Sequence, residues 1–268
     1  VEEVSINPNF TGTATEGNYG VEDPRIVKIG KKYYMTYVTV SMNEGVSSNL
    51  ATCTKFGYWQ RQGIIFREQN KDTVMFPQKI KNKFAALHRP EGFFEFSRPS
   101  IWIAYSPDSI YWGKERALLH PRPKGWDSIR IGSGAPPIKT KEGWLMIYHG
   151  VRPAKNHGIY SAGAILLDKK NPEKVIARSP LSKPLFEPYY SWEKKGVVDG
   201  VVFPTGVVPD LNKKDLLIYY GGADKVIAVA KIGIDEIISH MSPVIEDPRE
   251  NLPKNLVKGR SARVKTKQ

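Results

Sequence analysis

The chain has 268 residues, of which 40% are hydrophobic and 11% aromatic, so it can bury a sizeable core and is not globally disordered. Its formal net charge is +13 at pH 7, but the lysines and arginines are scattered, and only residues 254–268 form a basic cluster. We rank three explanations of this positive charge: a solvated surface comes first, binding of an anionic substrate second and binding of nucleic acid third. We therefore expect no nucleic-acid partner.

A single cysteine, Cys53, excludes an internal disulfide framework and fits a reducing compartment, so we expect a cytoplasmic protein. We interpret Cys53 as a small apolar strand residue rather than a nucleophile. No segment approaches the roughly 18 apolar residues that a membrane-spanning helix needs, and the sequence shows no basic-then-apolar leader. We therefore expect no membrane partner.

The first recognisable unit covers residues 21–37 and reads as two short strands joined by a turn. β-Branched and aromatic residues fill both strands, and Gly30 begins the turn between them. The tetrapeptide Glu22-Asp23-Pro24-Arg25 precedes the first strand. Pro24 should push Asp23 towards an extended conformation, which would hold the carboxylate in place.

This hairpin unit recurs three times further along the chain. Each copy has an entry with a proline, a hairpin, a third strand and usually a fourth; the entry prolines are Pro24, Pro77, Pro137 and Pro204. Their spacing of roughly 50 to 70 residues is typical of propeller blades. We therefore predict an all-β fold, a β-propeller with four full blades whose entry loops line one mouth. Residues 1–20 can hold only the end of another blade, so a first blade is expected to be missing or incomplete.

The repeats divide the chain into two regions. Residues 1–240 should form the β-propeller catalytic domain with an incomplete N-terminal blade, and residues 234–240 should form a short capping helix. Residues 241–268 are expected to be a basic C-terminal extension outside the propeller.

Closure of the repeats into a ring would bring polar residues to one mouth, because equivalent positions in successive blades then face one axis. The members of this set are Asp23, Arg25, His88, Arg89, Arg130, His149, Asp199 and Asp224, with Tyr160 and Phe203 as aromatic walls. Taken singly, each has an ordinary explanation, since a histidine that ends a strand is usually a hydrogen-bonded structural residue. Residues 246–249 even repeat the Glu-Asp-Pro-Arg tetrapeptide with no hairpin after it.

The candidate set holds one acid in the key hairpin and several cations. Ordinary glycoside hydrolysis needs two carboxylates, and Asp224 is a candidate for the second. Arg89, Arg130 and His149 instead suit an anionic nucleophile such as phosphate, which arginine binds through charge-assisted, often bidentate bonds. The sequence has neither a Cys/His cluster nor an acidic loop with ligand spacing. We therefore expect no metal site and no cofactor, only inorganic phosphate as co-substrate.

Several of these motifs occur together in one known family. The sequence resembles the β-mannoside phosphorylases and β-mannosidases of glycoside hydrolase family 130, whose phosphorylases are five-bladed β-propellers. The matching segments are residues 22–25, 76–80, 87–90, 126–138, 143–150, 202–204 and 219–224, which follow one another in order between residues 20 and 238. The resemblance implies a five-bladed β-propeller here as well, and a homo-oligomer is a reasonable expectation from it.

The resemblance also implies an activity. This activity is the inverting phosphorolysis of β-1,4-mannosides, such as mannobiose, mannooligosaccharides or mannosyl-glucose and mannosyl-N-acetylglucosamine, to α-mannose 1-phosphate. Asp23 would be the single general acid, acting through a sugar hydroxyl, while phosphate attacks the anomeric carbon from the other face. The residues expected to bind the sugar are Arg25, His88, Tyr160, Phe203 and Asp224, and those expected to bind phosphate are Arg89, Arg130 and His149.

Two alternatives remain open. One is a β-mannoside hydrolase of the same family, whose members place glutamates where the phosphorylases keep basic residues; no such replacement occurs at these positions here. The other is a sugar-binding propeller without turnover. Some positions depart from the family pattern, because Arg130 stands where many relatives carry lysine and Asp199 replaces the more usual asparagine. The acceptor sugar should depend on loops such as residues 91–99 and 154–158.

Overall fold

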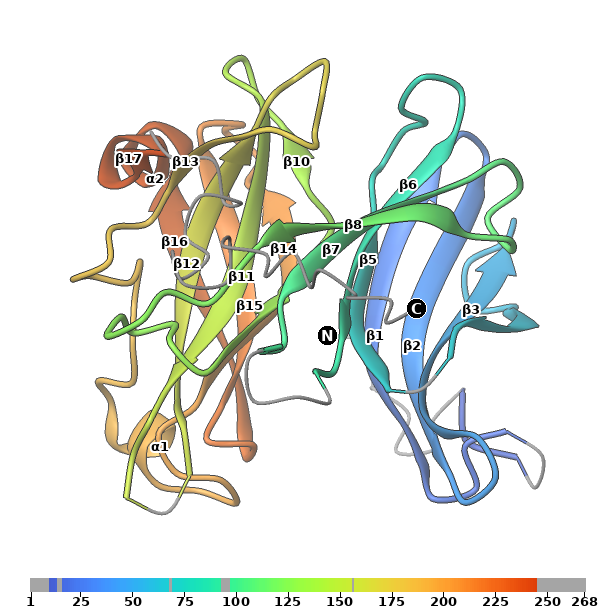
Figure 1. The fold of residues 1–268 in the computed structure, drawn as a ribbon, viewed down its shortest axis with the longest axis horizontal. Helices are drawn as coiled ribbons and strands as arrows, with labels where there is room; N and C mark the ends of the chain where they lie inside the picture. Colours follow the sequence, from blue (N-terminus) through green and yellow to red (C-terminus); the bar gives the residue numbers. More distant parts are fainter. Residues whose placement is uncertain (1–9, 14–15, 68, 93–96, 156, 245–268) are drawn as a thin grey trace, which may run out of the picture.

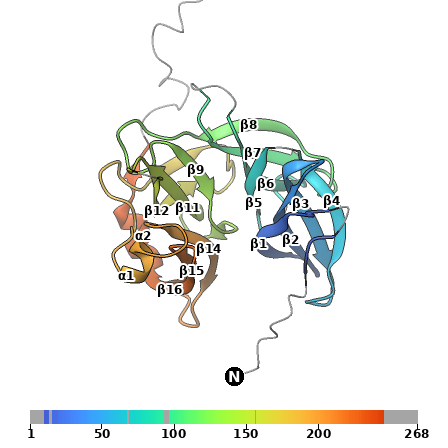
Figure 2. The same ribbon diagram turned by 90° about the horizontal axis from the view of Figure 1, so that it is seen from below.

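Four antiparallel sheets make up the part of the chain that the computed structural model describes, which is residues 10–13, 16–67, 69–92, 97–155 and 157–244. They follow one another along the chain and around a common axis (Figures 1 and 2). The first two sheets have the strand orders β1-β2-β3-β4 and β5-β6-β7-β8. Their strands are β1 (Gly20–Ile29), β2 (Lys32–Ser41), β3 (Gly45–Cys53), β4 (Gln60–Phe66), β5 (Asn70–Met75), β6 (Phe84–Pro90), β7 (Ile101–Ser106) and β8 (Gly113–Leu119).

The third sheet has an interrupted inner strand. Both β9 (Arg130–Ser133) and β10 (Ile138–Lys139) pair with β11 (Trp144–Arg152). The strand is interrupted between them because the intervening Gly-Ala-Pro-Pro segment offers few amide donors to the hydrogen-bond ladder. The sheet continues through β12 (Ile159–Leu167), β13 (Val175–Arg178) and β17 (Ser242–Pro243). The fourth sheet has only three strands, which are β14 (Val202–Pro209), β15 (Asp215–Gly222) and β16 (Val226–Gly233).

Two short helices are present among the described residues, α1 (Ser191–Lys194) and α2 (Ile234–His240). The second coincides with the capping helix that the sequence predicts. Neither is long and apolar enough to cross a lipid bilayer. Strand β17 pairs with β13, so sheet pairing continues to Pro243, beyond the boundary expected at residue 240. Residues 245–268 of the expected C-terminal extension lie outside the described residues.

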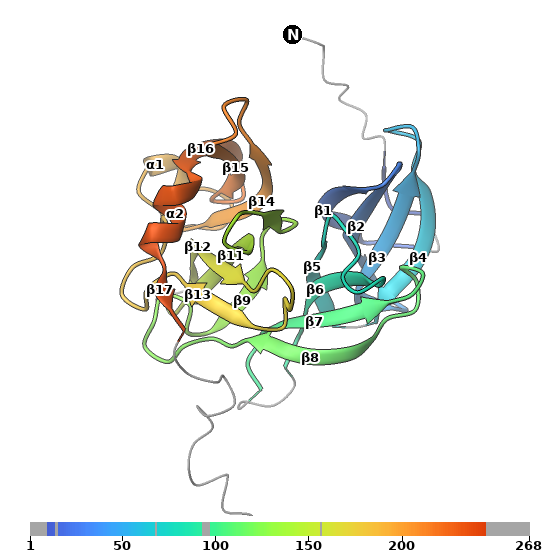
Figure 3. The same ribbon diagram turned by 90° about the horizontal axis from the view of Figure 1, so that it is seen from above.

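The inner strands of the sheets meet at the axis. Strand β1 contacts β5 and β14, and β5 contacts β9, as Figures 2 and 3 show from opposite sides. An all-β, propeller-like fold with four blades is therefore confirmed, with one sheet for each sequence repeat. Strands β1 and β14 are in contact at the axis, whereas the outer strands of the first and fourth sheets lie apart in Figure 2, and the fifth blade remains a prediction.

Hydrophobic side chains between neighbouring sheets hold the arc together. Strand β11 shows the principle, since successive side chains of a strand point to opposite faces. Trp144, Met146 and Tyr148 pack towards the second sheet, whereas Leu145 and Ile147 pack towards the fourth. A strand buried on both faces reads as a continuous apolar run rather than an alternating one. This packing fixes how the inner strands sit around the axis.

Two inner strands carry an aspartate at a β-bulge. The register of β1 shifts between Glu22 and Arg25, and that of β5 shifts between Lys71 and Val74. Asp23 has a φ of 53° and Asp72 a φ of 54°. The prediction that Pro24 holds Asp23 extended is therefore wrong. A bulge inserts one extra residue into the strand, and aspartate is among the few residues that tolerate the left-handed conformation.

Candidate active site

A buried carboxylate with two nitrogen-bearing partners lies where the inner strands meet. Arg89 Nη1 is 2.8 Å from Asp72 Oδ2, and His149 Nε2 is 3.5 Å from the same oxygen. Asp72 comes from the bulge of β5, Arg89 from β6 and His149 from β11. All three side chains are buried. The second and third sheets thus share one polar cluster.

Aromatic rings from the third and fourth sheets border this cluster. The Phe203 ring centroid is 4.6 Å from that of His149, and the Tyr160 centroid is 5.9 Å from it. The guanidinium carbon of Arg25 lies 5.6 Å from the Phe203 centroid, and that of Arg130 lies 5.7 Å from the Tyr160 centroid. The geometry favours cation–π attraction in both pairs. The site therefore receives residues from all four sheets.

Several nitrogens of this cluster are buried without a hydrogen-bond partner among the described residues. They are Arg25 Nη2, Arg89 Nε, Arg130 Nε and both ring nitrogens of His149. Buried donors are normally satisfied, because leaving one unpaired costs free energy. The three guanidinium groups also carry more positive charge than Asp72 and Glu91, the two carboxylates paired with Arg89, can balance. The arrangement suits an oxyanion such as phosphate, which would satisfy the free donors and the excess charge together.

The Asp23 carboxyl is set up to hold a proton. Burial raises its pKa; Arg25 opposes this effect, and the nearby Asp72 carboxylate reinforces it. A carboxylic acid whose pKa moves towards neutrality can donate a proton to a leaving group. Asp23 therefore has the electrostatic setting of a general acid beside an anion site.

His149 is neutral at physiological pH. Burial lowers its pKa to about 3; Asp72 acts in the opposite direction, and the three arginines of the cluster lower the pKa further. A neutral imidazole has one donor and one acceptor nitrogen. His149 can therefore donate one hydrogen bond to a bound anion without adding a positive charge to the cluster.

His88 does not join the cluster, and its expected convergence with the other residues is wrong. The ring is fully buried and stacks on Phe66, with centroids 4.1 Å apart, between the first and second sheets. Asn70 Nδ2 lies 2.9 Å from His88 Nδ1, and burial lowers the pKa of His88 to about 3. Neighbouring residues of a strand face opposite sides. Because Arg89 points to the site, His88 must point away from it.

The two other predicted acids lie outside the buried cluster. Asp224 is exposed in the turn after β15, with a φ of 50°. Its turn is close to the beginning of β14, since Val202 pairs with Gly222. Asp199 accepts hydrogen bonds from Lys195 Nζ and from the backbone amide of Gly196. The structure therefore brings together Arg25, Arg89, Arg130, His149, Tyr160 and Phe203, but neither of these aspartates.

Asp72 is the site residue that sequence reasoning missed. It precedes the apolar entry of the second repeat, as Asp23 precedes the hairpin of the first, and this shared place was the available signal. The segment Lys71-Asp72-Thr73 lacks the proline that made Asp23 conspicuous.

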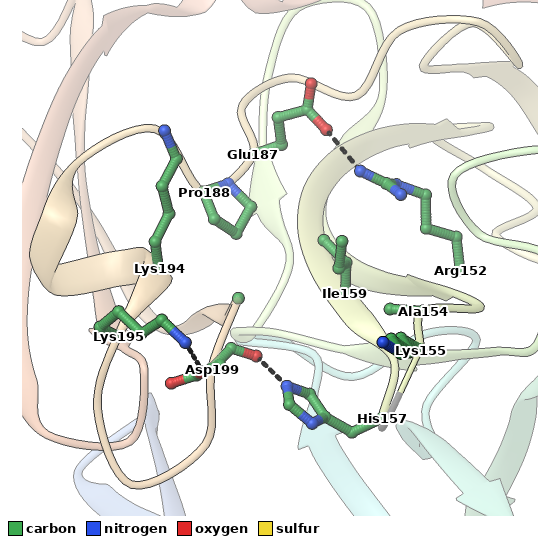
Figure 4. Close-up of a pocket in the computed structure, with 11 residues that line it drawn as sticks. Arg152, Ala154, Lys155, His157, Ile159, Glu187, Pro188, Lys194, Lys195 and Asp199 are labelled. Atoms are coloured by element: carbon green, nitrogen blue, oxygen red, sulfur yellow. Dashed lines mark hydrogen bonds and ion pairs between the residues drawn. The ribbon is translucent and has the colours of Figure 1, made fainter.

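A cavity of about 450 Å³ lies beside the backbone of Tyr160, whose neighbour Ile159 lines it (Figure 4). Its wall includes Ile159 and Gly200, and the Tyr160 amide donates a hydrogen bond of 3.0 Å to the Gly200 carbonyl. Arg152 and Glu187 form an ion pair of 3.8 Å on one side of the cavity. The other lining residues are Ala154, Lys155, His157, Pro188, Lys194, Lys195 and Asp199. The loop that is expected to influence the acceptor sugar, residues 154–158, thus contributes to this wall.

The fold and the site define a class of protein, a propeller-like scaffold whose axis carries a buried, arginine-rich cluster beside an aspartate, Asp23, whose pKa burial raises. The particular family follows from comparison with known proteins. The chain belongs to glycoside hydrolase family 130, because the family model described as beta-1,4-mannooligosaccharide phosphorylase matches residues 2–243. Glycoside phosphorylase is therefore the enzyme class of this family member.

Three similar proteins carry more specific names. The chain is 42% identical over 81% of its length to a 1,2-beta-oligomannan phosphorylase of Thermoanaerobacter sp. (strain X514), covering 70% of that protein. It is 32% identical over 86% of its length to a beta-1,4-mannooligosaccharide phosphorylase of Ruminococcus albus, covering 68%. The structure of beta-1,2-mannobiose phosphorylase from Listeria innocua with beta-1,2-mannobiose has a TM-score of 0.81 and 38% identity. That match covers 88% of this chain and 64% of the Listeria chain, so the chain spans about two thirds of these relatives.

Proposed function

We propose that the chain catalyses the inverting phosphorolysis of β-mannosides and releases α-mannose 1-phosphate. The observation that carries this proposal is a group of buried nitrogens on Arg25, Arg89, Arg130 and His149 that have no hydrogen-bond partner among the described residues. They lie in the same cluster as an acid, Asp23, whose pKa is raised. A proton donor beside an anion site is what a phosphorolytic reaction needs, because phosphate takes the place of water and of its general base.

The proposed reaction exchanges one bond for another at the anomeric carbon. A phosphate oxygen attacks this carbon from one face, and the bond to the leaving sugar oxygen breaks on the other face. The Asp23 proton passes through a sugar hydroxyl to the departing oxygen, so the leaving sugar is released neutral. Arg89, Arg130 and His149 hold the phosphate, while Arg25, Tyr160 and Phe203 face the mannose. Asp224, at the rim, is a further proposed sugar ligand.

The preferred linkage is proposed from the relatives. Sequence analysis led us to expect β-1,4-mannosides. The relatives at 42% and 38% identity are named for β-1,2-linked mannosides, however, and the one named for β-1,4-linked substrates is 32% identical. We therefore propose β-1,2-mannosides as the preferred substrates and β-1,4-mannosides as the alternative.

The cavity beside Tyr160 is proposed to receive the leaving part of the substrate. Its lining includes Ile159, the neighbour of Tyr160 in β12, and offers both donors and acceptors, such as Arg152 and Glu187. Sugar hydroxyls can use both kinds of partner. A volume of about 450 Å³ is within the range of small-molecule pockets.

Hydrolysis is the second candidate, because Asp72 provides another carboxylate near Asp23. Burial alone would raise the pKa of Asp72, but the surrounding cations, with Arg89 foremost, outweigh burial and lower it. A carboxylate that is paired with arginine and has a lowered pKa is a weak base for activating water. This electrostatic setting favours phosphate over water as the nucleophile.

The test is product identification with the purified protein. The protein is incubated with β-1,2-mannobiose or β-1,4-mannobiose, each with and without inorganic phosphate. We expect α-mannose 1-phosphate only when phosphate is present, and a faster reaction with the β-1,2-linked sugar. Equal release of free mannose with and without phosphate would replace the proposal by hydrolysis. Binding of mannobiose without any product would instead identify a sugar-binding propeller.

A further inference from the structure

Asp72 occupies an enclosed position at the centre of the cationic cluster. Its side chain is 2% exposed, and its Oδ2 atom is the shared neighbour of Arg89 and His149. The space around it is closed, since a Cβ atom at Gly132 would clash with both the Asp72 carboxylate and the His149 ring. The carboxylate therefore cannot shift without moving the groups on either side.

The Asp72 carboxylate points to Arg89 and His149 because of its backbone. The bulge in β5 and the left-handed φ of 54° turn the side chain out of the regular alternation of the strand. Non-glycine residues in the left-handed region are uncommon, and they cluster at functional sites.

Arg89 and His149 also have nitrogens that make no hydrogen bond within the described residues. Arg89 uses Nη1 for Asp72 and Nη2 for Glu91, and its Nε has no partner among the described residues. Neither ring nitrogen of His149 makes a hydrogen bond within the described part of the chain. The Asp72 carboxylate thus limits how these two side chains can turn while leaving them donors for a ligand.

We propose that Asp72 is a positioning residue for the reaction, whose carboxylate holds Arg89 and His149 in the orientation that receives the attacking anion. The proposal rests on the proposed function for the identity of that anion as phosphate. Asp72 itself touches neither substrate in this assignment. It acts through Arg89 and His149, whose geometry it sets.

Simple electrostatics and positioning predict opposite results for the loss of this carboxylate. A negative charge near an anion site repels the anion, so neutralising an uninvolved Asp72 should tighten phosphate binding. If Asp72 instead positions Arg89 and His149, neutralising it should weaken binding, because the ion pair that orients Arg89 is then lost. The direction of the change therefore separates the two roles.

The matched control is Asp127, another fully buried aspartate that pairs with arginines. Its carboxylate binds Arg122 and Arg178 and accepts a hydrogen bond of 2.9 Å from the Tyr148 hydroxyl. Arg178 comes from β13, whereas Arg122 and Asp127 come from the segment between β8 and β9. Asp127→Asn should therefore cost stability without changing phosphate binding.

The experiment is calorimetric titration of inorganic phosphate into the wild type, Asp72→Asn and Asp127→Asn. We expect Asp72→Asn to raise the phosphate Kd by roughly 10- to 100-fold, and Asp127→Asn to leave it within about twofold of the wild type. In steady-state kinetics the KM for phosphate should rise in Asp72→Asn more than the KM for mannobiose. Thermal unfolding of each variant shows whether it is folded.

Unchanged or tighter phosphate binding by folded Asp72→Asn would overturn the proposal, and so would a wild type that binds no phosphate. If Asp72→Asn does not fold, Gly132→Ala replaces it, because this change displaces Asp72 and His149 without removing a charge. Gly132→Ala should also weaken phosphate binding, and unchanged binding would again contradict the proposal. A wild type that binds phosphate but forms no mannose 1-phosphate would contradict the proposed function alone.

Discussion

Arg25 in the first sheet donates a hydrogen bond from Nε to the carbonyl oxygen of Gly134 in the third sheet, 109 residues further along the chain. Gly134 belongs to the segment that interrupts the inner strand between β9 and β10. The bond thus links two sheets directly at the axis, and it aims the Arg25 guanidinium at the Phe203 ring. The Arg25 side chain therefore contributes both to the contact between the two sheets and to the candidate active site.

Replacing Arg25 should affect both the stability of the protein and the binding of the sugar. Arg25→Lys keeps the positive charge but removes the planar guanidinium group. In the wild type this group binds the Gly134 carbonyl through Nε and has an unpaired Nη2 for a ligand, among the described residues. We expect the free energy of unfolding to fall by about 1.5 to 3 kcal/mol, the range for a hydrogen bond to a charged group. The KM for mannobiose should rise as well. Urea unfolding and steady-state kinetics measure the two effects.

The control for this change is Arg67→Lys, at an exposed position just after β4. It should alter neither the unfolding free energy nor the kinetics. An Arg25→Lys variant as stable as the wild type would show that the bond to Gly134 contributes nothing net.

Asp23→Asn should remove activity without loss of stability. The general acid contributes about 10²- to 10⁴-fold to the rate, so kcat should fall within that range. Burial raises the pKa of Asp23, which means that folding disfavours its charged form. The wild type should accordingly lose stability as pH rises from the unfolded pKa near 3.8 to the folded pKa, and Asp23→Asn should lose less over this interval. Thermal unfolding followed from pH 3 to pH 8 measures this difference, and equal pH dependence in the two proteins would contradict it.

The repeats were readable from the sequence because apolar residues, turns and entry prolines recur in order, and this made the propeller predictable. The convergence of Arg89, Arg130 and His149 followed from the repeats as well. Strand alternation alone could have shown that His88 and Arg89 face opposite sides. The conformation of Asp23 was not readable, since a bulge depends on pairing register and not on local propensity.

The role of Asp72 and the preferred linkage needed information beyond the sequence motifs. Asp72 is distinguished by contacts with Arg89 and His149, which lie 17 and 77 residues away along the chain. A preference between β-1,2 and β-1,4 linkages depends on the shape of the leaving-group pocket, to which separate loops contribute.

The pH profile of the reaction should respond to Asp72. In the proposed reaction the free enzyme requires protonated Asp23, so kcat/KM should fall as pH rises through the pKa of Asp23. The negative charge of Asp72 helps to raise that pKa, while Arg25 and Lys71 lower it and Glu22 raises it slightly. In Asp72→Asn the pKa of Asp23 should therefore decrease, and the basic limb of the profile should move to lower pH. A limb that stays in place, or moves to higher pH, would contradict this coupling.

Arg152 allows a test of the leaving-group pocket that does not disturb the anion site. Arg152 lies at the end of β11 and pairs with Glu187 at 3.8 Å, on the wall of the cavity beside Tyr160. In Arg152→Ala the KM for mannobiose should rise about 3- to 10-fold, the effect of losing one or two hydrogen bonds, and the KM for phosphate should stay the same. Arg116→Ala is the matched control, because Arg116 of β8 forms a similar ion pair at 3.2 Å with Glu173 of the loop between β12 and β13. An equal effect of both variants on mannobiose, or an effect of Arg152→Ala on phosphate alone, would place the leaving sugar elsewhere.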